Sequence, residues 1–410
     1  SKAAGSDKAV TVSGYTIGGA SAGNYTLAQP TGLTADIARR ALSVSAAGVD
    51  KTYDGNTSAT VTLADNRVAG DNLTAAYAEA AFADRHAGAG KTINVSGLTI
   101  AGADADNYIL ASTTATASAS IVPRPVAVAA APDSKDYDGT TASAGAPFLT
   151  SGSLVPGDSA AWTQTFADRN AGSGKTLIPA GSVDDGNNGA NYDVTFVTSS
   201  SGVITARPLT VAAVADSKTY DGTTASPAAP VISAGSLAAG DTAAWTQSFD
   251  TPAVGSGKTL TPAGAVSDGN GGLNYDVTFV GSSAGEITPR PITVTADTQA
   301  KPYGEPDPAL TWQITAGSLA AGDSLSGTLT RDSGENAGAY PIRQGTLSAG
   351  PNYDLAFVLG TLTIHKAVLT VTADDKTRAY GAPNPVFTAA YSGFVNGETL
   401  ATSGVTGPPA

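Results

Sequence analysis

The chain of 410 residues contains no cysteine and no methionine, and 22 basic against 35 acidic residues give it a formal charge of −13. The lack of cysteine excludes disulfides, thiolate metal sites and thiol nucleophiles, and the acidic balance argues against nucleic-acid binding, which needs clustered lysine and arginine. No apolar run approaches the ~20 residues of a membrane helix. Since signal peptide and initiator methionine are both absent, we expect an internal piece of an exported protein that does not insert into membranes.

An internal repeat of about 83 residues dominates the sequence. The string Lys-x-Tyr-Asp-Gly-x-Thr begins at Lys51, Lys135 and Lys218, and shorter relatives begin at Lys301 and Arg378. An Asn-Tyr pair follows each complete string, and a Gly-Asp pair lies between the two. The Asn-Tyr pairs are Asn24-Tyr25, Asn107-Tyr108, Asn191-Tyr192, Asn274-Tyr275 and Asn352-Tyr353, and the Gly-Asp pairs begin at Gly70, Gly157, Gly240 and Gly322.

Local patterns along each repeat predict β-strands. Residues 75–83 are alanine-rich and helix-like, but a strand with a small-residue face explains them equally well. Residues 92–100 and 291–295 alternate apolar and polar side chains, as half-buried strands do. The Asp/Gly/Asn run at 184–189 predicts a turn.

The repeats divide the chain into six segments. We place them at residues 1–40, 41–124, 125–207, 208–290, 291–366 and 367–410, the first and last being half units. Six or seven short strands in about 80 residues predict a tandem array of small all-β domains, either β-sandwiches or β-grasp-like folds. Proline-containing junctions such as residues 123–125 leave no flexible linker. Five lengths of roughly 33 Å would then give a rod on the order of 150 Å.

These motifs resemble two related repeat families. The Lys-x-Tyr-Asp-Gly-x-Thr string with its downstream Asn-Tyr resembles the YDG repeat of large bacterial exoproteins, and the strings at 301–308 and 379–385 resemble the MBG repeat. The resemblance implies an all-β fold in a filamentous-haemagglutinin-like adhesin, including two-partner-secreted and biofilm-matrix adhesins. Such repeats form the stalk there, and the families have no shared catalytic residues.

Two strings look like catalytic motifs but lack their context. Gly-Ser-Gly-Lys-Thr at 172–176 and 255–259 resembles the end of a phosphate loop, yet Arg169 and Pro252 stand where the pattern needs glycine. Residues 281–285 match a nucleophile elbow, but the same positions one repeat earlier do not. The two histidines lie in different repeats, so we predict that the protein is not an enzyme.

Acidic loops are candidate calcium sites, because closely spaced oxygen donors suit Ca²⁺. The same residue types also form tight turns, and both interpretations stay open. No other cofactor is expected. The candidate ligands, together with the neighbouring Asn191 and Asn274, are Asp184, Asp185, Asn187, Asp193, Asp268, Asn270 and Asp276.

Repeated aromatic residues have two interpretations. Tyr77, Trp162 and Trp245 occupy one repeat position and could stack on sugar rings, or they could belong to the core. We expect the tyrosine of the Tyr-Asp-Gly string to pack inward with its hydroxyl bonded at its own turn. The aspartate should cap that turn, and the following glycine should have positive φ.

The favoured function is a stalk that holds an adhesive tip at the bacterial cell surface or outside the cell. The alternative is a multivalent carbohydrate-binding module. The partners expected are extracellular polysaccharide or a neighbouring cell surface.

Overall fold

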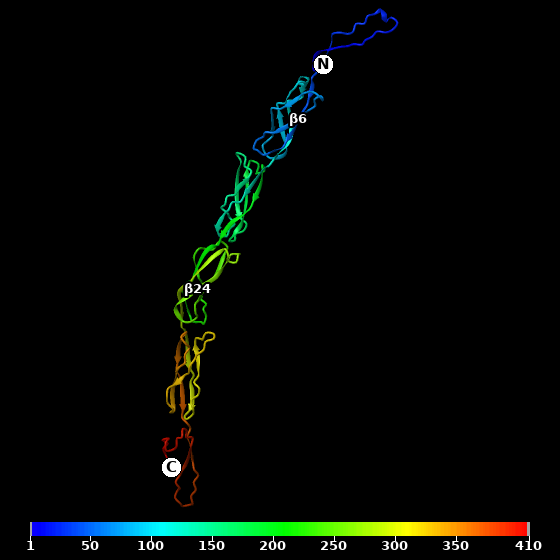
Figure 1. Ribbon diagram of the computed structural model, residues 1–410. Coiled ribbons are helices and arrows are strands. Elements are labelled where there is room, and N and C mark those ends of the chain that lie inside the picture. Colours follow the sequence, from blue (N-terminus) through cyan, green and yellow to red (C-terminus); the bar gives the residue numbers. More distant parts are fainter. Residues whose placement is uncertain (1, 408–410) are drawn as a thin grey trace. The chain divides into compact units, whose positions relative to one another are not determined.

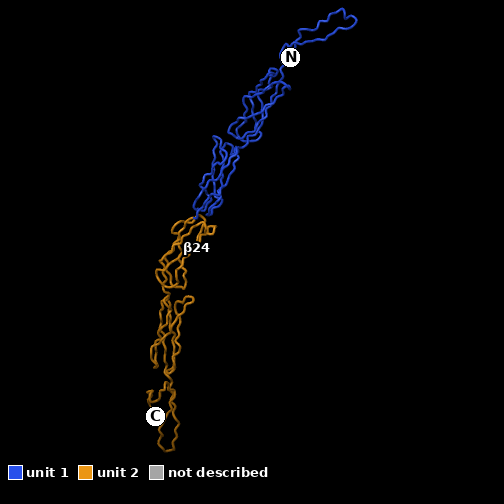
Figure 2. Tube along the Cα trace, in the orientation of Figure 1, with its two compact units in different colours: residues 1–206 blue, residues 207–410 orange. Residues whose placement is uncertain are grey.

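The computed structural model describes residues 2–407 and divides the chain into two compact units, residues 1–206 and 207–410 (Figure 2). Strands and short connections make up nearly all of both units, so the prediction of an all-β tandem array is confirmed (Figure 1). Two single-turn 3₁₀ helices, η1 (Ala22–Asn24) and η2 (Ala105–Asn107), interrupt the strands. No helix within residues 2–407 is both long and apolar enough to cross a membrane.

Residues 124–205 show the plan of a complete repeat, which is a sandwich of two sheets and not a β-grasp. A three-stranded sheet has the order β15-β13-β18, and a four-stranded sheet has the order β14-β19-β17-β16. The strands are β13 (Arg124–Ala129), β14 (Ser134–Asp136), β15 (Phe148–Ser151), β16 (Ser159–Phe166), β17 (Gly172–Asp184), β18 (Tyr192–Val197) and β19 (Ser199–Thr205).

The next two repeats have the same topology. Their sheets have the orders β22-β20-β25 with β21-β26-β24-β23, and β29-β27-β32 with β28-β33-β31-β30. The first set is β20 (Arg207–Ala212), β21 (Asp216–Thr219), β22 (Val231–Ala234), β23 (Thr242–Phe249), β24 (Gly255–Ser267), β25 (Tyr275–Val280) and β26 (Ser282–Thr288). The second is β27 (Arg290–Ala296), β28 (Gln299–Pro302), β29 (Trp312–Ala316), β30 (Thr330–Arg331), β31 (Gly338–Arg343), β32 (Tyr353–Val358) and β33 (Gly360–His365).

The repeat that begins at Arg40 has a four-stranded sheet of order β5-β12-β9-β8, while its other strands pair two by two as β11-β3, β4-β6 and β10-β7. The alanine-rich run at 75–83 forms β7 and β8, so it is strand rather than helix. The strands are β3 (Arg40–Leu42), β4 (Val44–Val49), β5 (Lys51–Thr52), β6 (Thr60–Asp65), β7 (Thr74–Ala76), β8 (Glu79–Phe82), β9 (Gly88–Ser96), β10 (Thr99–Ala101), β11 (Tyr108–Leu110) and β12 (Thr114–Val122).

The two end segments each form one antiparallel pair. Near the N-terminus β1 (Gly5–Val10) pairs with β2 (Leu33–Ile37), and near the C-terminus β34 (Thr370–Ala373) pairs with β35 (Ala389–Ser392). The predicted boundaries after residues 40, 124, 207 and 290 fall one residue inside β3, β13, β20 and β27, because each of these strands already begins at the arginine.

The Tyr-Asp-Gly turn has the structure expected from its sequence. Asp54 accepts a hydrogen bond from the Asn56 backbone N–H (3.1 Å), and Gly55 has a φ of 82°. The Lys51 ammonium donates to the Asp54 carboxylate (2.8 Å) and lies 5.6 Å from the centre of the Phe82 ring. Asp138 and Asp221 cap the equivalent turns through Thr140 and Thr223 (2.8 Å each), so the predicted capping role is confirmed.

Apolar and polar side chains alternate along the strands, so the apolar ones fill the interior of each sandwich and are almost fully buried. On β17 and β24 the inward residues Leu177 and Leu260 are 0% exposed. The cores also continue from one repeat into the next within each unit. In the first unit one cluster joins Tyr53 and Ile93 to Val155 and Tyr192 of the following repeat.

Candidate functional site at the junction between repeats

Parallel strand pairing places the two tyrosine motifs at opposite ends of a repeat. β5 pairs in parallel with the last strand, β12, and the backbone N–H of Tyr53 then donates to Val122 O (2.9 Å). In the next repeat the first strand, β13, pairs in parallel with β18, beginning at Arg124 opposite Tyr192. Only Pro123 separates β12 from β13. The Tyr-Asp-Gly motif of one repeat therefore meets the Asn-Tyr motif of the next.

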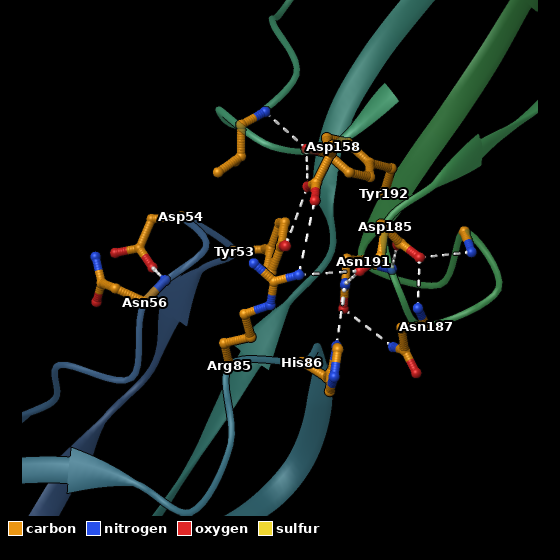
Figure 3. Close-up of polar contacts among 12 residues, drawn as sticks. Tyr53, Asp54, Asn56, Arg85, His86, Asp158, Asp185, Asn187, Asn191 and Tyr192 are labelled. Atoms are coloured by element: carbon orange, nitrogen blue, oxygen red, sulfur yellow. Dashed lines mark hydrogen bonds and ion pairs between the residues drawn. The ribbon is translucent and has the colours of Figure 1, made fainter. Parts of the chain in front are cut away.

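Three side chains from the two repeats form the centre of this junction (Figure 3). The hydroxyls of Tyr53 and Tyr192 both donate to Oδ2 of Asp158, at 3.1 and 2.7 Å. The Tyr192 oxygen also accepts a hydrogen bond from the Val155 N–H (2.8 Å). The two rings meet edge to face with centroids 5.5 Å apart, a favourable aromatic geometry. One carboxylate thus joins two phenols that are far apart in the sequence.

Burial and the shared carboxylate raise the pKa of both phenols. Burial, together with the hydrogen bond to Asp158, raises the pKa of Tyr192 to about 12. The same two causes raise the pKa of Tyr53 above its ordinary value. A hydrogen bond to a charged acceptor is stronger than one between neutral groups, and burial strengthens it further. The Tyr53 hydroxyl was expected at its own turn, and that prediction is wrong because the hydroxyl reaches the next repeat.

The asparagine of the Asn-Tyr pair makes the second contact between the repeats. Asn191, which is 0% exposed, accepts a hydrogen bond from the Ala87 N–H on its side-chain oxygen (2.8 Å). Its side-chain nitrogen lies 3.3 Å from Nδ1 of His86 (Figure 3). Arg85 extends alongside, with a guanidinium nitrogen 3.9 Å from Oδ1 of Asp158.

The second unit contains the same junction. The hydroxyls of Tyr220 and Tyr353 donate to Oδ2 of Asp323 at 3.0 and 2.7 Å, and the two rings again meet edge to face at 5.5 Å. The Val254 N–H donates to the side-chain oxygen of Asn352 (3.1 Å).

The outer segments repeat parts of this arrangement. In the first unit the Ala4 N–H donates to the side chain of Asn107 (2.8 Å), and the Tyr108 hydroxyl donates to Asp71 (2.6 Å). In the second unit the Tyr303 hydroxyl donates to Glu398 (2.6 Å), so glutamate takes the place of aspartate. The contact therefore recurs at successive junctions within each unit.

Sequence reasoning missed the junction although it identified every motif that builds it. Equivalent positions show what the repeats share, but not which repeat contacts which. The Gly-Asp pairs did carry a signal for the junction. Asp158 and Asp323 recur at one repeat position, where neither a strand nor a capped turn calls for an aspartate.

The acidic loops next to the junction are turns in which Asp185 and Asp268 are buried. Asp185 is 2% exposed and accepts backbone hydrogen bonds from Asn187 and Gly189 on Oδ1 and from Asn191 on Oδ2 (2.7 to 2.9 Å). Asp268 accepts the equivalent three hydrogen bonds (2.7 to 3.0 Å). Asn187 and Asn270 donate to Asn191 and Asn274, and Asp184, Asp193 and Asp276 are exposed.

These hydrogen bonds determine how acid acts on the loop. Burial alone would raise the pKa of Asp185, but the three backbone N–H donors outweigh it and hold that pKa below its ordinary value. Because the folded-state pKa is the lower one, the stabilisation is fully present above the unfolded pKa and is lost as pH falls through the folded value.

Trp162 and Trp245 are half-buried beside the sandwich edge. The Trp162 ring meets Phe196 edge to face at 5.7 Å, and Trp245 meets Phe279 at 5.8 Å. Gly181 lies opposite Trp162 on the paired strand, where an added Cβ would stand 2.9 Å from the indole ring. Tyr77 is also half-buried and packs against the core cluster that contains Tyr53 and Tyr192. Sugar binding by these residues stays a prediction.

Comparison with protein families assigns the repeats. The YDG domain matches residues 1–32, 38–116, 122–201 and 205–284, which is more than half of the chain. The chain belongs to the YDG domain family. Residues 292–363 and 369–408 match the MBG domain (YGX type). The junction at Tyr53 therefore joins two YDG repeats, whereas the junction at Tyr220 joins a YDG repeat to an MBG repeat.

Other comparisons add little to this assignment. No curated protein matches the YDG chain significantly. Among solved structures, it is similar to the N-terminal four Ig domains of Dscam1 isoform 4.44 (10% identity, 78% of this chain, 96% of that chain, TM-score 0.17). It is also similar to Drosophila N-cadherin EC1-4 (11% identity, 78% of this chain, 99% of that chain, TM-score 0.18). These scores are too low to support any functional argument.

The shared carboxylate predicts energetic coupling between neighbouring repeats. We expect Tyr53→Phe and Asp158→Asn to be non-additive by about 1–2 kcal/mol in the free energy of opening the junction, because each removes the same charge-assisted hydrogen bond. Hydrogen exchange of the Ala87 amide measures that opening in the intact chain. Tyr53→Phe with Asp168→Asn is the control pair, since Asp168 bonds Lys175 inside one repeat. If the effects were additive in both pairs of variants, the prediction of coupling through Asp158 would be wrong.

The calcium prediction has a direct test. Within residues 2–407 no three or more His, Asp or Glu side chains are grouped so as to hold a metal, and both oxygens of Asp185 already accept backbone hydrogen bonds. We therefore expect calorimetric melting temperatures of the intact chain to be the same with added Ca²⁺ and with chelator. A fall in the chelated sample would show that the acidic loops bind calcium.

For the tryptophans we expect a structural effect. Trp162→Ala and Trp245→Ala should each cost about 2 kcal/mol, less than for a fully buried ring, and lower the melting temperature of that repeat by about 10 °C. Calorimetry of the intact chain measures this, with exposed Thr163→Ala as the control. Variants that keep their stability but lose binding to a matrix polysaccharide would instead support sugar stacking.

Proposed function

We propose that the chain is a stalk segment of a large extracellular adhesion protein, in which YDG and MBG repeats act as spacers. The observation that carries this proposal is the use of the repeat motifs at the junctions. Tyr53, Asp158, Asn191 and Tyr192 form hydrogen-bonded contacts between repeats. Motifs that link neighbouring repeats are what a structural element built from repeats in series requires.

The physical properties of the junction at Tyr53 support stiffness within the first unit. A one-residue connector whose proline has a fixed φ allows little rotation. Bending would also break buried hydrogen bonds and separate apolar side chains that form one continuous cluster with Tyr53. An apolar core that crosses a domain boundary resembles a large hydrophobic interface, which restrains relative domain motion.

The catalytic lookalikes have structural roles that fit this proposal. Gly172–Thr176 forms the start of β17, and Lys175 makes an ion pair with Asp168. Ser283 lies within β26. His86 contacts Asn191 in the first unit, and His365 ends β33 in the second unit.

The acidic charge suits a protein exposed outside the cell. A formal charge of −13 keeps neighbouring chains apart by repulsion. Family membership supports an adhesion-type role, and the bacterial surface and its matrix are the setting that the family resemblance implies. The adhesive tip would lie elsewhere in the parent protein.

Small-angle X-ray scattering of the intact chain tests the proposal. We expect a maximum dimension on the order of 150 Å and a cross-section of one β-sandwich, because serially linked repeats add their lengths. Raising the salt concentration should leave this dimension unchanged if the junctions, and not charge repulsion, keep the chain extended. A particle with the dimensions of a compact globule would overturn the stalk proposal.

A further inference from the structure

The junctions differ at one loop position, which lies three residues before the glycine that begins the long strand of each YDG repeat. Lys2, Arg85 and Arg169 place a cation there, before Gly5, Gly88 and Gly172. The last YDG repeat has Pro252 at this position, before Gly255. The proline has neither a charge nor a backbone N–H, so any role played by the cation is lost at this junction.

In the first unit the cation reaches the aspartate of the following repeat. Lys2 Nζ lies 2.8 Å from Oδ1 of Asp71, and a guanidinium nitrogen of Arg85 lies 3.9 Å from Oδ1 of Asp158. The Asp71 and Asp158 side chains are 8% and 1% exposed. Among the described residues no hydrogen-bond donor reaches Oδ1 of Asp158. Since a buried carboxylate is costly unless it is compensated, the Arg85 charge favours the closed junction.

Arg85 also contacts a second element of the following repeat. Its guanidinium donates to the backbone oxygen of Asp185 (3.5 Å), in the turn that carries Asn191 (Figure 3). One side chain therefore spans both halves of the junction, the aspartate loop and the Asn-Tyr turn.

The junction between the YDG and MBG repeats keeps the phenol–carboxylate centre. Because Pro252 stands in the place of Arg85, it lacks the two contacts that Arg85 makes. Asp323 is exposed there, although both tyrosines still bond it. The side chain that faces the turn glycine is also smaller there, alanine in place of valine. A Cβ on Gly55 would stand 2.4 Å from the Val155 side chain, whereas a Cβ on Gly222 would stand 3.2 Å from Ala320.

We propose that this loop position sets the stiffness of the junction within each unit, so that Pro252 makes the YDG–MBG junction of the second unit a hinge, whereas Arg85 stiffens the YDG–YDG junction of the first unit. The inference deepens the stalk proposal and rests on it for its biological meaning. Junction opening is measured locally, however, so a failure of this inference is distinct from finding a compact particle by scattering.

Hydrogen exchange in the full chain compares the two junctions through equivalent amides. The Ala87 and Val254 N–H groups each bond the junction asparagine of the next repeat, and each is exposed when its junction opens. After correction for intrinsic rates, we expect Val254 to exchange about tenfold faster than Ala87. Arg85→Gln should speed Ala87 exchange by about tenfold, and Pro252→Arg should slow Val254 exchange. Equal exchange at the two amides, or no response to Arg85→Gln, would overturn the proposal.

Arg343→Gln is the matched control, because Arg343 makes an exposed ion pair with Asp332 inside one repeat. It should leave both amides unchanged. If it speeds their exchange as much as Arg85→Gln does, the effect reflects general loss of charge and the proposal fails.

Spin-label distances give a second measurement, made simple by the absence of cysteine. Exposed strand positions allow one label pair across each junction, Thr62→Cys with Thr163→Cys and Thr246→Cys with Gln313→Cys. We expect a broader distance distribution for the second pair, narrowed by Pro252→Arg. Equal widths in the parent chain would contradict a hinge, whatever the variants do.

Discussion

The structure depends on one buried carboxylate that two phenols share across a domain boundary. Asp158 accepts hydrogen bonds from Tyr53 of the preceding repeat and from Tyr192 of its own. Neither tyrosine could bury its hydroxyl without an acceptor, and the carboxylate could not be buried without donors. Each of these two repeats therefore supplies hydrogen-bond partners for buried polar groups of the other.

Parallel pairing explains why this is possible with motifs so far apart in sequence. The strand before Tyr53 pairs in parallel with the last strand of its repeat. The strand that begins at Tyr192 pairs in parallel with the first strand of the next repeat. Both tyrosines consequently lie at the single-residue connector. The same pairing recurs for Tyr220 and Tyr353, which is how YDG and MBG repeats of different length share one junction chemistry.

Much of the fold followed from the sequence, because periodicity and turn chemistry are local. Alternating side chains predicted the strands, and Asp54 with Gly55 predicted a capped turn. The recurring Gly-Asp pairs mark the acceptor of the Tyr53 hydroxyl, but its position next to Tyr53 depends on which strands pair in parallel, which local patterns do not show. The acidic loop was ambiguous for a related reason. Composition cannot tell whether the oxygens of Asp185 meet backbone N–H groups or a cation.

The parallel ladders also determine how a repeat responds to tension. A pull along the chain acts on the first strand, β13, and on the last strand, β19, which are bonded in parallel to β18 and β14. Force directed along such a ladder is borne by all of its hydrogen bonds together, in shear. An antiparallel hairpin pulled at its open end gives way one bond at a time. The arrangement that brings the tyrosines to the junction thus also distributes mechanical load across each sandwich.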